Sequence, residues 1–265
     1  MAKDKMGTRM KEYEREYEQT FKTGSPVLAR IDGRCFSKFT KFCSKPFSQN
    51  LHDNFVETVR ALMRETGADI GYTQSDEITL MWLNDRPDGQ LWFGGKVQKM
   101  VSSLSAFTTA KFNELVKPQK FAMFDARVWQ IEDHTEVMNS VLWRVIDCDK
   151  NAVSALAHHI FSHNELQGKH KDQMLDMLNE RQSIDQNSAM IREFLELKPF
   201  RQGTFISKAV HFSHLSEQER EELPEKHNVH KFPDLMIKRA HYVKQNIPFA
   251  TMTYNDRMNF LGLNI

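Results

Sequence analysis

The chain has 265 residues, of which 40% are hydrophobic and 27% are charged, and its formal net charge is +1. This length fits one large domain, or a domain with an appendage, and permits a sizeable core. The near-neutral charge excludes a polybasic protein, so any nucleic-acid binding must rest on a local basic patch. The three cysteines, Cys35, Cys43 and Cys148, argue against a disulfide framework and against a zinc site.

The N-terminal region favours a helix over residues 6–21, because Met6, Met10, Tyr13 and Tyr17 recur at helical spacing. This region is charged and lacks the apolar segment of a secretory signal. No apolar run approaches the roughly 20 residues of a membrane span. We therefore expect a cytoplasmic protein with no membrane partner.

The first expected strand, residues 27–33, is a short apolar run that ends in Asp32 and Gly33. A continuous apolar run of this length predicts a mostly buried strand that delivers Asp32 at its carboxyl end. The following residues, 34–45, interleave phenylalanines with basic side chains. The phenylalanines fit a helical core stripe, whereas the basic side chains could face phosphates held near Asp32.

A second acid follows a helix expected over residues 50–65. Two strands, 68–72 and 78–82, flank a hairpin tip at 73–77 that carries Asp76. If this hairpin pairs with the first strand, Asp32 and Asp76 come close together. Two such carboxylates suit divalent cations that hold phosphates, although aspartate is also common in turns at strand ends.

The rest of the chain predicts a turn, further helices and two further strands. Ser75 and two lysines in the first turn of one helix, Lys96 and Lys99, could neutralise a triphosphate, although such lysines are more often solvated. No phosphate-binding glycine loop of the standard nucleotide-binding folds is present. The expected elements are a turn at 85–89, helices at 96–115, 135–162 and 167–182, and strands at 121–131 and 205–212, before a charged tail at 213–229.

This order of elements predicts an α+β fold. We expect an antiparallel sheet with helices packed on one face, arranged as a polymerase-like palm, plus a mainly helical C-terminal part. The expected division is a catalytic domain over residues 1–212 and an extension of unknown role over 213–265.

Several motifs together resemble one family, the tRNA-histidine guanylyltransferase superfamily with its 3′-to-5′ polymerase-like relatives. The resemblance runs from about residue 6 to residue 209. It is carried by R-M-K-E-Y-E at 9–14, R-I-D-G-R-C-F-S-K-F at 30–39, G-Y-T-Q-S-D-E at 71–77, F-D-A-R-V at 124–128, where the family usually has glycine at Ala126, and F-R-Q-G-T at 200–204.

The resemblance implies a two-metal nucleotidyl transfer to the 5′ end of tRNA, activated by ATP or GTP, in a homotetramer. Two Mg²⁺ ions would be held by Asp32, Asp76 and the Gly33 carbonyl. Glu77, next to Asp76, is expected in the catalytic set with the two aspartates, although on a regular strand it points to the opposite face and is then either a supporting group or solvated. Arg127 and Arg201 would contact tRNA. The residues implied to bind the nucleotide are Asp32, Gly33, Arg34, Cys35, Phe36, Ser37, Lys38, Lys45, Ser75, Asp76, Lys96 and Lys99, with Ser37 standing where the family usually has histidine.

One departure favours a branch of the family. The guanylyltransferases proper carry H-I-N-N where this chain has Asp149-Lys150-Asn151-Ala152. This favours templated repair of tRNA 5′ ends over untemplated addition of G at position −1, which stays the alternative. Two other hypotheses are a palm-fold nucleotide cyclase and a non-catalytic RNA-binding protein that uses residues 34–45.

Overall fold

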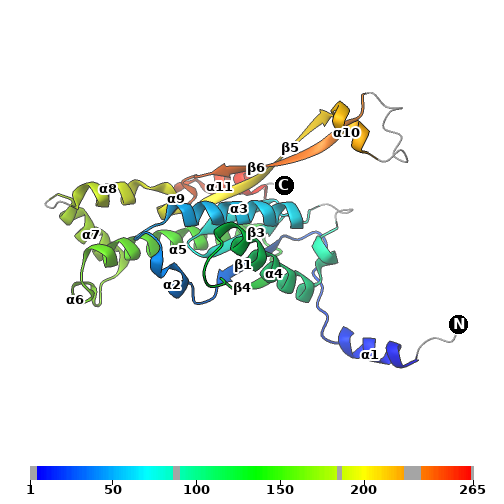
Figure 1. Ribbon diagram of the computed structural model, residues 1–265, viewed down its shortest axis with the longest axis horizontal. Coiled ribbons are helices and arrows are strands. Elements are labelled where there is room, and N and C mark those ends of the chain that lie inside the picture. The colour runs from blue at the N-terminus through cyan, green and yellow to red at the C-terminus, as the bar shows by residue number, and fades with distance from the viewer. Residues whose placement is uncertain (1–4, 86–89, 184–186, 224–233, 264–265) are drawn as a thin grey trace.

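The computed structural model describes residues 5–85, 90–183, 187–223 and 234–263. The strands of these residues form one antiparallel sheet in the order β4-β1-β3-β2-β5-β6, with helices around it (Figure 1). The α+β class predicted from the sequence is therefore confirmed. The strands are β1 (Val27–Gly33), β2 (Ile70–Gln74), β3 (Glu77–Trp82), β4 (Phe124–Gln130), β5 (Thr204–His214) and β6 (Met236–Gln245).

Several helices begin or end at residues that satisfy free backbone groups. Ser48 accepts a hydrogen bond from the Leu51 amide at the start of α3, and Gly67 ends that helix in the left-handed region. Asp133 caps the longest helix, α5, in the same way. The α-helices are α1 (Lys5–Arg15), α2 (Phe36–Phe39), α3 (Gln49–Thr66), α4 (Val97–Val116), α5 (His134–Ile160), α6 (His163–Leu166), α7 (Lys171–Gln182), α8 (Ser188–Glu196), α9 (Lys198–Gln202), α10 (Glu217–Glu222) and α11 (Tyr254–Leu261), and the 3₁₀ turns are η1 (Thr40–Phe42), η2 (Trp92–Gly95) and η5 (Phe249–Thr251).

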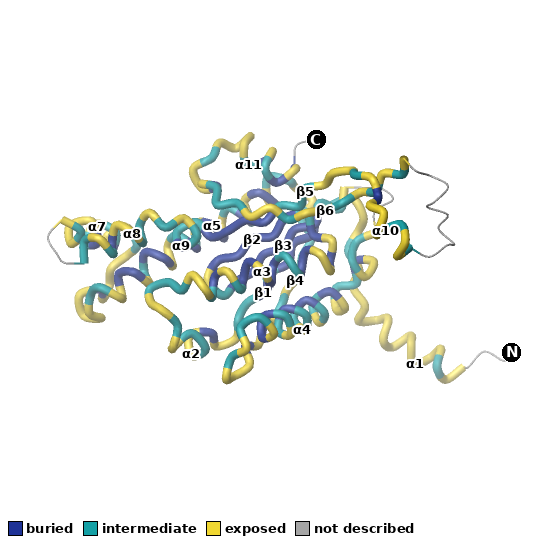
Figure 2. Tube along the Cα trace, turned by 45° about the horizontal axis from the view of Figure 1, so that its top comes forward, coloured by how far each residue is buried: buried dark blue, intermediate teal, exposed yellow. Residues whose placement is uncertain are grey.

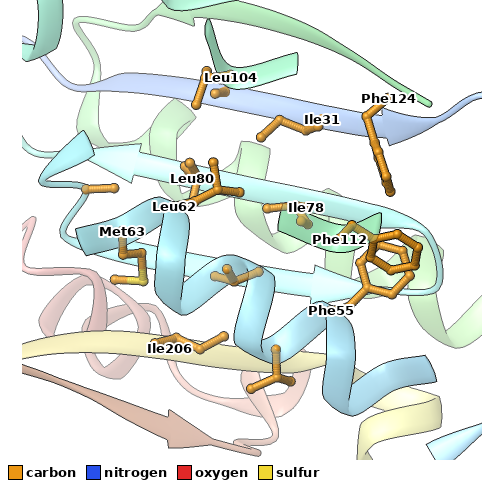
Figure 3. Packing of buried hydrophobic residues seen from close by; sticks show 14 of the residues in the cluster. Ile31, Phe55, Leu62, Met63, Ile78, Leu80, Leu104, Phe112, Phe124 and Ile206 are labelled. Atoms are coloured by element: carbon orange, nitrogen blue, oxygen red, sulfur yellow. The ribbon is translucent and has the colours of Figure 1, made fainter. Parts of the chain in front are cut away.

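Helices cover both faces of the sheet. On one face, Ile31 of β1 and Leu80 of β3 pack against α3 and α4, as Figure 3 shows. On the other face, Leu28 and Met81 pack against α5 and α11. The expectation of helices on one face is therefore wrong. The physical reason is visible in β1, whose alternate residues point to opposite faces and are apolar on both.

A third apolar cluster holds the helical part of the chain together. The C-terminal half of α5 packs against α6, α7, α8 and α9 through residues such as Leu156, Leu178 and Phe200. These helices lie beside the end of the sheet from which α5 emerges (Figure 2). The arrangement extends α5 beyond the sheet and lets one helix connect two cores.

The C-terminal residues take part in the same sheet and core. The expected boundary at residue 212 falls inside β5, and β6 pairs with β5 along ten residues. Phe249 and Leu261 are buried in the cluster that contains Leu28. The C-terminal part was expected to be mainly helical, but the longest described element after residue 212 is strand β6. The division into a catalytic domain and an extension stays a prediction.

Several element bounds differ from those expected. The N-terminal helix ends at Arg15 instead of residue 21, and it buries no side chain. It projects away from the sheet and its helices (Figure 1). The helix expected from residue 167 begins at Lys171. The expected turn at 85–89 lies mostly outside the described residues. No helix in the described part of the chain has the length and apolar character needed to cross a membrane.

Candidate active site

Asp32 and Asp76 meet at one end of the sheet. Asp32 is the penultimate residue of β1, and the next residue, Gly33, donates its N–H to the Asp76 carbonyl oxygen at 3.2 Å. The hairpin is tighter than expected, because β2 and β3 pair up to Gln74 and Glu77 and leave two residues in the turn. The predicted convergence of the two strand ends is therefore present in the structure.

The Asp76 carboxyl group is partly buried and lies near a second acid, Asp32. Burial raises the pKa of Asp76, and the negative charge of Asp32 raises it further. A hydrogen bond of 3.0 Å from the Ser75 hydroxyl opposes this rise in pKa. Ser75 has a φ of 50°, a conformation that non-glycine residues adopt only at a cost. The turn thus presents a carboxylate whose charge is incompletely compensated by the protein.

These acids fit a divalent cation. Carboxylate and backbone carbonyl oxygens are the ligands that Mg²⁺ prefers, and Mg²⁺ usually takes only one or two carboxylates while water and phosphates complete its shell. The described residues contain no group of three or more histidine, cysteine or acidic side chains able to hold a metal by themselves. The pair of aspartates therefore matches a site completed by a phosphate-bearing substrate.

Three acids form a row across the sheet at this end. Asp32 is the cross-strand partner of Glu77 on β3 and of Asp125 on β4. Directly paired residues of antiparallel strands project from the same face. Asp125 was not singled out in the sequence, although its alternation with Arg127 on one strand already indicated a shared face. Arg127 contacts Asp125 at 3.4 Å, and both side chains are about half exposed.

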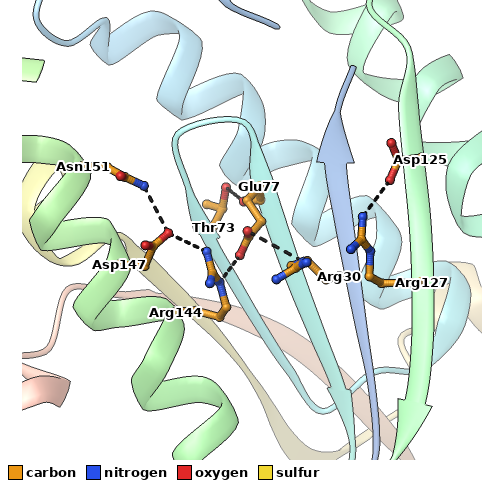
Figure 4. Close-up of polar contacts among 8 residues, drawn as sticks. All are labelled: Arg30, Thr73, Glu77, Asp125, Arg127, Arg144, Asp147 and Asn151. Carbon is orange, nitrogen blue, oxygen red and sulfur yellow. Dashed lines mark hydrogen bonds and ion pairs between the residues drawn. The ribbon is translucent and has the colours of Figure 1, made fainter. Parts of the chain in front are cut away.

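Glu77 belongs to a buried ionic network (Figure 4). Its carboxylate accepts a hydrogen bond from Arg144 Nε at 2.7 Å and lies 4.0 Å from Arg30 Nε. Arg144 also donates to Asp147 at 2.7 Å, and Asp147 accepts from Asn151 at 3.1 Å. Burial raises the pKa of Glu77, and the two guanidinium groups offset part of that rise. Arg30, Arg144 and Asp147 carry no sequence motif that marks them as partners of Glu77.

A cavity of about 150 Å³ opens beside Asp76. It lies between the hairpin turn, the loop before α3, and helices α5 and α9. Among the residues expected to bind nucleotide, those that line it are Phe36, Lys45, Ser75 and Asp76. The lining also includes Thr40, His52, Cys148 and Asn151, none of which was predicted to bind nucleotide.

Two titratable side chains that line this cavity, His52 and Cys148, each keep one protonation state at neutral pH. Burial lowers the pKa of His52 to about 4, and its ring shares a hydrogen bond of 2.9 Å with the Thr204 hydroxyl. Burial raises the pKa of the Cys148 thiol to about 12. His52 is therefore a neutral hydrogen-bonding group, and Cys148 is a thiol and no nucleophile.

Three other residues that were predicted to contact nucleotide or tRNA, Lys96, Lys99 and Arg201, do not line this cavity. Lys96 pairs with Glu18 and is bridged through its backbone to Thr20. Lys99 lies in the first turn of α4. Arg201 pairs with Asp149, which also pairs with Lys171.

The loop residues after Asp32 divide into buried and exposed positions. Phe36 is a core residue whose ring packs at an angle against the rings of Phe39 and Phe124. Cys35 is exposed and has a φ of 54°. Arg34 donates its amide to the Met123 carbonyl oxygen, and Lys38 donates its amide to the Cys35 carbonyl oxygen. Ser37 lies within the short helix α2.

The sheet, the two neighbouring aspartates and the adjoining cavity fit one class of protein, the nucleotidyltransferases. Comparison with known proteins specifies the family. A family model described as tRNAHis guanylyltransferase (Thg1) matches residues 7–132. An uncharacterised protein, R259, of Acanthamoeba polyphaga mimivirus is 30% identical over 208 residues, which cover 68% of this chain and 71% of that protein. The chain belongs to the Thg1 family and is a nucleotidyltransferase.

Solved structures are similar over nearly the whole chain. A bacterial Thg1-like protein in complex with ATP has a TM-score of 0.76 and 29% identity, covering 98% of this chain and 100% of that one. A bacterial Thg1-like protein in complex with GTP has a TM-score of 0.69 and 28% identity, covering 98% and 99%. The Saccharomyces cerevisiae tRNA(His) guanylyltransferase has a TM-score of 0.59 and 19% identity, covering 74% and 91%, and it shows the shared fold.

Proposed function

We propose that this protein adds nucleotides in the 3′-to-5′ direction to the 5′ end of tRNA, as a templated repair of truncated ends. The single observation that carries this proposal is the approach of Asp32 to Asp76 beside a cavity, in a chain of the Thg1 family. The sheet with this pair at one end would serve as a polymerase-like palm. Similarity to bacterial Thg1-like proteins over 98% of the chain favours this branch.

The activating nucleotide would be ATP or GTP, with part of it in the cavity. The cavity is smaller than the roughly 300 to 1,000 Å³ of a typical small-molecule site, so the triphosphate would lie outside it over Asp76. Lys45 and Ser75 line the same cavity and supply an ammonium and a hydroxyl for phosphate oxygens. The backbone of residues 32–37 would complete this contact.

The reaction would take two steps. An oxygen of the tRNA 5′-phosphate attacks the α-phosphate of the activating nucleotide and releases pyrophosphate. The 3′-hydroxyl of the incoming nucleotide then attacks the activated 5′-phosphate and releases the nucleoside monophosphate. Two Mg²⁺ ions held by Asp32, Asp76 and the Gly33 carbonyl would supply charge stabilisation for both in-line displacements.

The other predicted residues have distinct parts in this proposal. Glu77 would act by positioning, because its carboxylate already holds Arg144 and Arg30. Arg127, with its half-exposed side chain, would contact tRNA. Arg201 is proposed to contact tRNA as well, and this would require it to share or leave Asp149. Lys38, Lys96 and Lys99 would act on the outer part of the triphosphate or on RNA.

The stretch Asp149–Ala152, which corresponds to H-I-N-N in the guanylyltransferases, lacks the histidine and the last asparagine of that motif, and this absence favours repair. In its place, Asp149 pairs with Arg201 and Lys171, and Asn151 donates a hydrogen bond to Asp147, so these side chains connect helices. Addition of G at position −1 is the second candidate. The proposal also includes a cytoplasmic homotetramer, and the exposed Met10 and Tyr13 of α1 offer apolar surface to a second subunit.

The test is an extension assay with a 5′-truncated tRNA, nucleoside triphosphates and Mg²⁺. We expect addition of the nucleotide complementary to the template base, and loss of addition in Asp76→Ala. Exchanging the base opposite the gap distinguishes repair from fixed addition of G. Product formation from nucleotides alone, without RNA, would instead indicate a cyclase.

A further inference from the structure

A second, larger hollow lies next to the cavity at Asp76. Three residues, Cys43, Ser48 and Leu51, line both hollows. The second one is a groove of about 730 Å³, bounded by residues 38–54 on one side and by residues 116–120, at the end of α4, on the other. Whatever lies in this groove is therefore separated from the candidate active site by one short segment of chain.

The side chains that line the groove carry a net positive charge. Lys38 and Lys41 stand on one wall and Lys120 on the other, and no acidic side chain is among the described residues that line it. The whole chain is almost neutral, so this local excess of ammonium groups is a departure from its average. Closely spaced lysines without acidic neighbours attract an anion that carries several charges, such as a nucleic-acid backbone.

The groove also has an exposed aromatic ring. Phe36 and Phe39, which precede it at intervals of three residues, belong to or pack against the core, whereas Phe42 is 90% exposed. The helical-stripe interpretation therefore holds for the first two phenylalanines and is wrong for the third. Phe42 contributes little to the core, and an exposed ring among lysines is the usual combination for stacking an unpaired base.

We propose that this groove binds the unpaired 3′ end of the tRNA substrate, with lysines on its phosphates and Phe42 against one base. This inference rests on the proposed action on tRNA 5′ ends. Bases inside a duplex have no free face for a phenylalanine, so the ring selects an unpaired segment. In tRNA the unpaired segment nearest the 5′ end is the 3′ end of the opposite strand, and the groove adjoins the site where the 5′ end would react.

The experiment measures binding, which does not depend on catalysis. Full-length tRNA and the same tRNA without its unpaired 3′ nucleotides are each titrated with protein by fluorescence anisotropy, without nucleotides. The variants are Phe42→Ala, Phe42→Tyr and the double variant Lys38→Gln/Lys41→Gln. Phe121→Ala is the matched control, because Phe121 is 77% exposed and next to Lys120 but outside the groove lining.

We expect Phe42→Ala to weaken binding of full-length tRNA about 10-fold and to leave binding of the trimmed tRNA unchanged. Phe42→Tyr keeps a stacking ring and should bind like the wild type, as should Phe121→Ala. The double lysine variant should reduce the slope of log affinity against log salt by about 0.7 for each lysine, and only with the full-length RNA.

Two results would overturn the inference. Equal weakening by Phe42→Ala on both RNAs would assign the groove to another part of the tRNA. No weakening on either RNA would show that the groove binds no RNA. In both cases the wild-type protein still binds and extends tRNA. Failure of the wild type to bind any tRNA would instead refute the proposed function itself.

Discussion

Arg144 on α5 donates a hydrogen bond of 2.7 Å from its Nε to the carboxylate of Glu77, the first residue after the Asp76 turn. Both side chains are at least 90% buried, and the pair joins the hairpin to the long helix across the sheet. Arg144 also stacks over the ring of Trp143 at 4.2 Å. The position of Asp76 therefore depends on a contact between residues 67 positions apart.

Loss of the ion pair between Arg144 and Glu77 should lower the stability of the folded protein. Arg144→Met leaves Glu77 buried with only the more distant Arg30, so we expect the free energy of unfolding to fall by about 3 to 5 kcal/mol. Urea denaturation measures this change. Lys111→Met is the control, because its partner Glu114 is exposed and such pairs contribute less than about 1 kcal/mol. Equal losses in the two variants would contradict the role assigned to burial.

The Asp76 carboxylate should oppose folding when no cation is bound. Its pKa is raised by burial and by Asp32, which means that the charged form is disfavoured in the folded state. We expect Asp76→Asn to melt at the same or a higher temperature than the wild type without Mg²⁺. Addition of Mg²⁺ with ATP should raise the melting temperature of the wild type and leave that of the variant nearly unchanged.

The same substitution should abolish most of the transfer activity. Loss of a ligand to a catalytic cation removes several kcal/mol of transition-state stabilisation, so we expect a fall of about 10³-fold in single-turnover rate. Asp53→Asn is the control, since Asp53 is exposed and pairs only with Lys244 and Gln49 among the described residues. Retention of the wild-type rate by Asp76→Asn would exclude Asp76 as a metal ligand.

His52 should make stability depend on pH. Its pKa falls to about 4 in the folded protein, from an ordinary value near 6.5, so the unfolded chain binds more protons between these values. Stability contributed by neutral His52 is therefore complete at pH 7 and is lost as the pH falls, by roughly 2 kcal/mol at pH 5.

His52→Gln is the matched variant for this prediction, because glutamine can keep a hydrogen bond to Thr204 without titrating. The difference in unfolding free energy between wild type and variant, followed by urea denaturation from pH 7 to pH 5, isolates the histidine from the carboxylates. A difference that does not change with pH would contradict the low pKa.

Gly203 should tolerate no side chain. It has a φ of 67° and a ψ of −165°, and an added Cβ would lie 2.5 Å from the Tyr72 hydroxyl oxygen and 2.7 Å from the Thr73 carbonyl oxygen. Gly67→Ala is the control: its φ is 73°, but a Cβ there meets nothing within 4 Å. We expect Gly67→Ala to cost about 1 to 2 kcal/mol and Gly203→Ala clearly more, measured by thermal unfolding.

Much of the local structure followed from patterns within a few residues. The strand at 27–33 was placed with its observed bounds, and the helix at 50–65 differs from α3 by one residue at each end. The covering of both faces could also have been inferred, since β1 is apolar at consecutive positions. The sequence could not assign Phe42 to solvent, because a spacing of three residues does not show where a helix stops.

The partners of the buried charges were beyond any local pattern. Glu77 with Arg144, and Asp149 with Arg201, are separated by 67 and 52 residues, and each acid had several other cations available in the sequence. Asp125 was visible as an acid on a strand, but only the register of β4 against β1 puts it opposite Asp32. Such pairings depend on how α5, α9 and β4 pack.

The sequence by itself determined the strand that carries Asp32, the hairpin whose turn carries Asp76, and the motifs of the Thg1 family. These features are local, because hydrophobic period and turn residues specify backbone conformation over short distances. Only the tertiary structure decided which side chains meet around those acids. It bound Glu77 to Arg144, tied Lys96 to Glu18, and left Lys38 and Phe42 on a separate groove. Contacts of this kind arise from packing of distant elements, and they decide which charges remain free for a substrate.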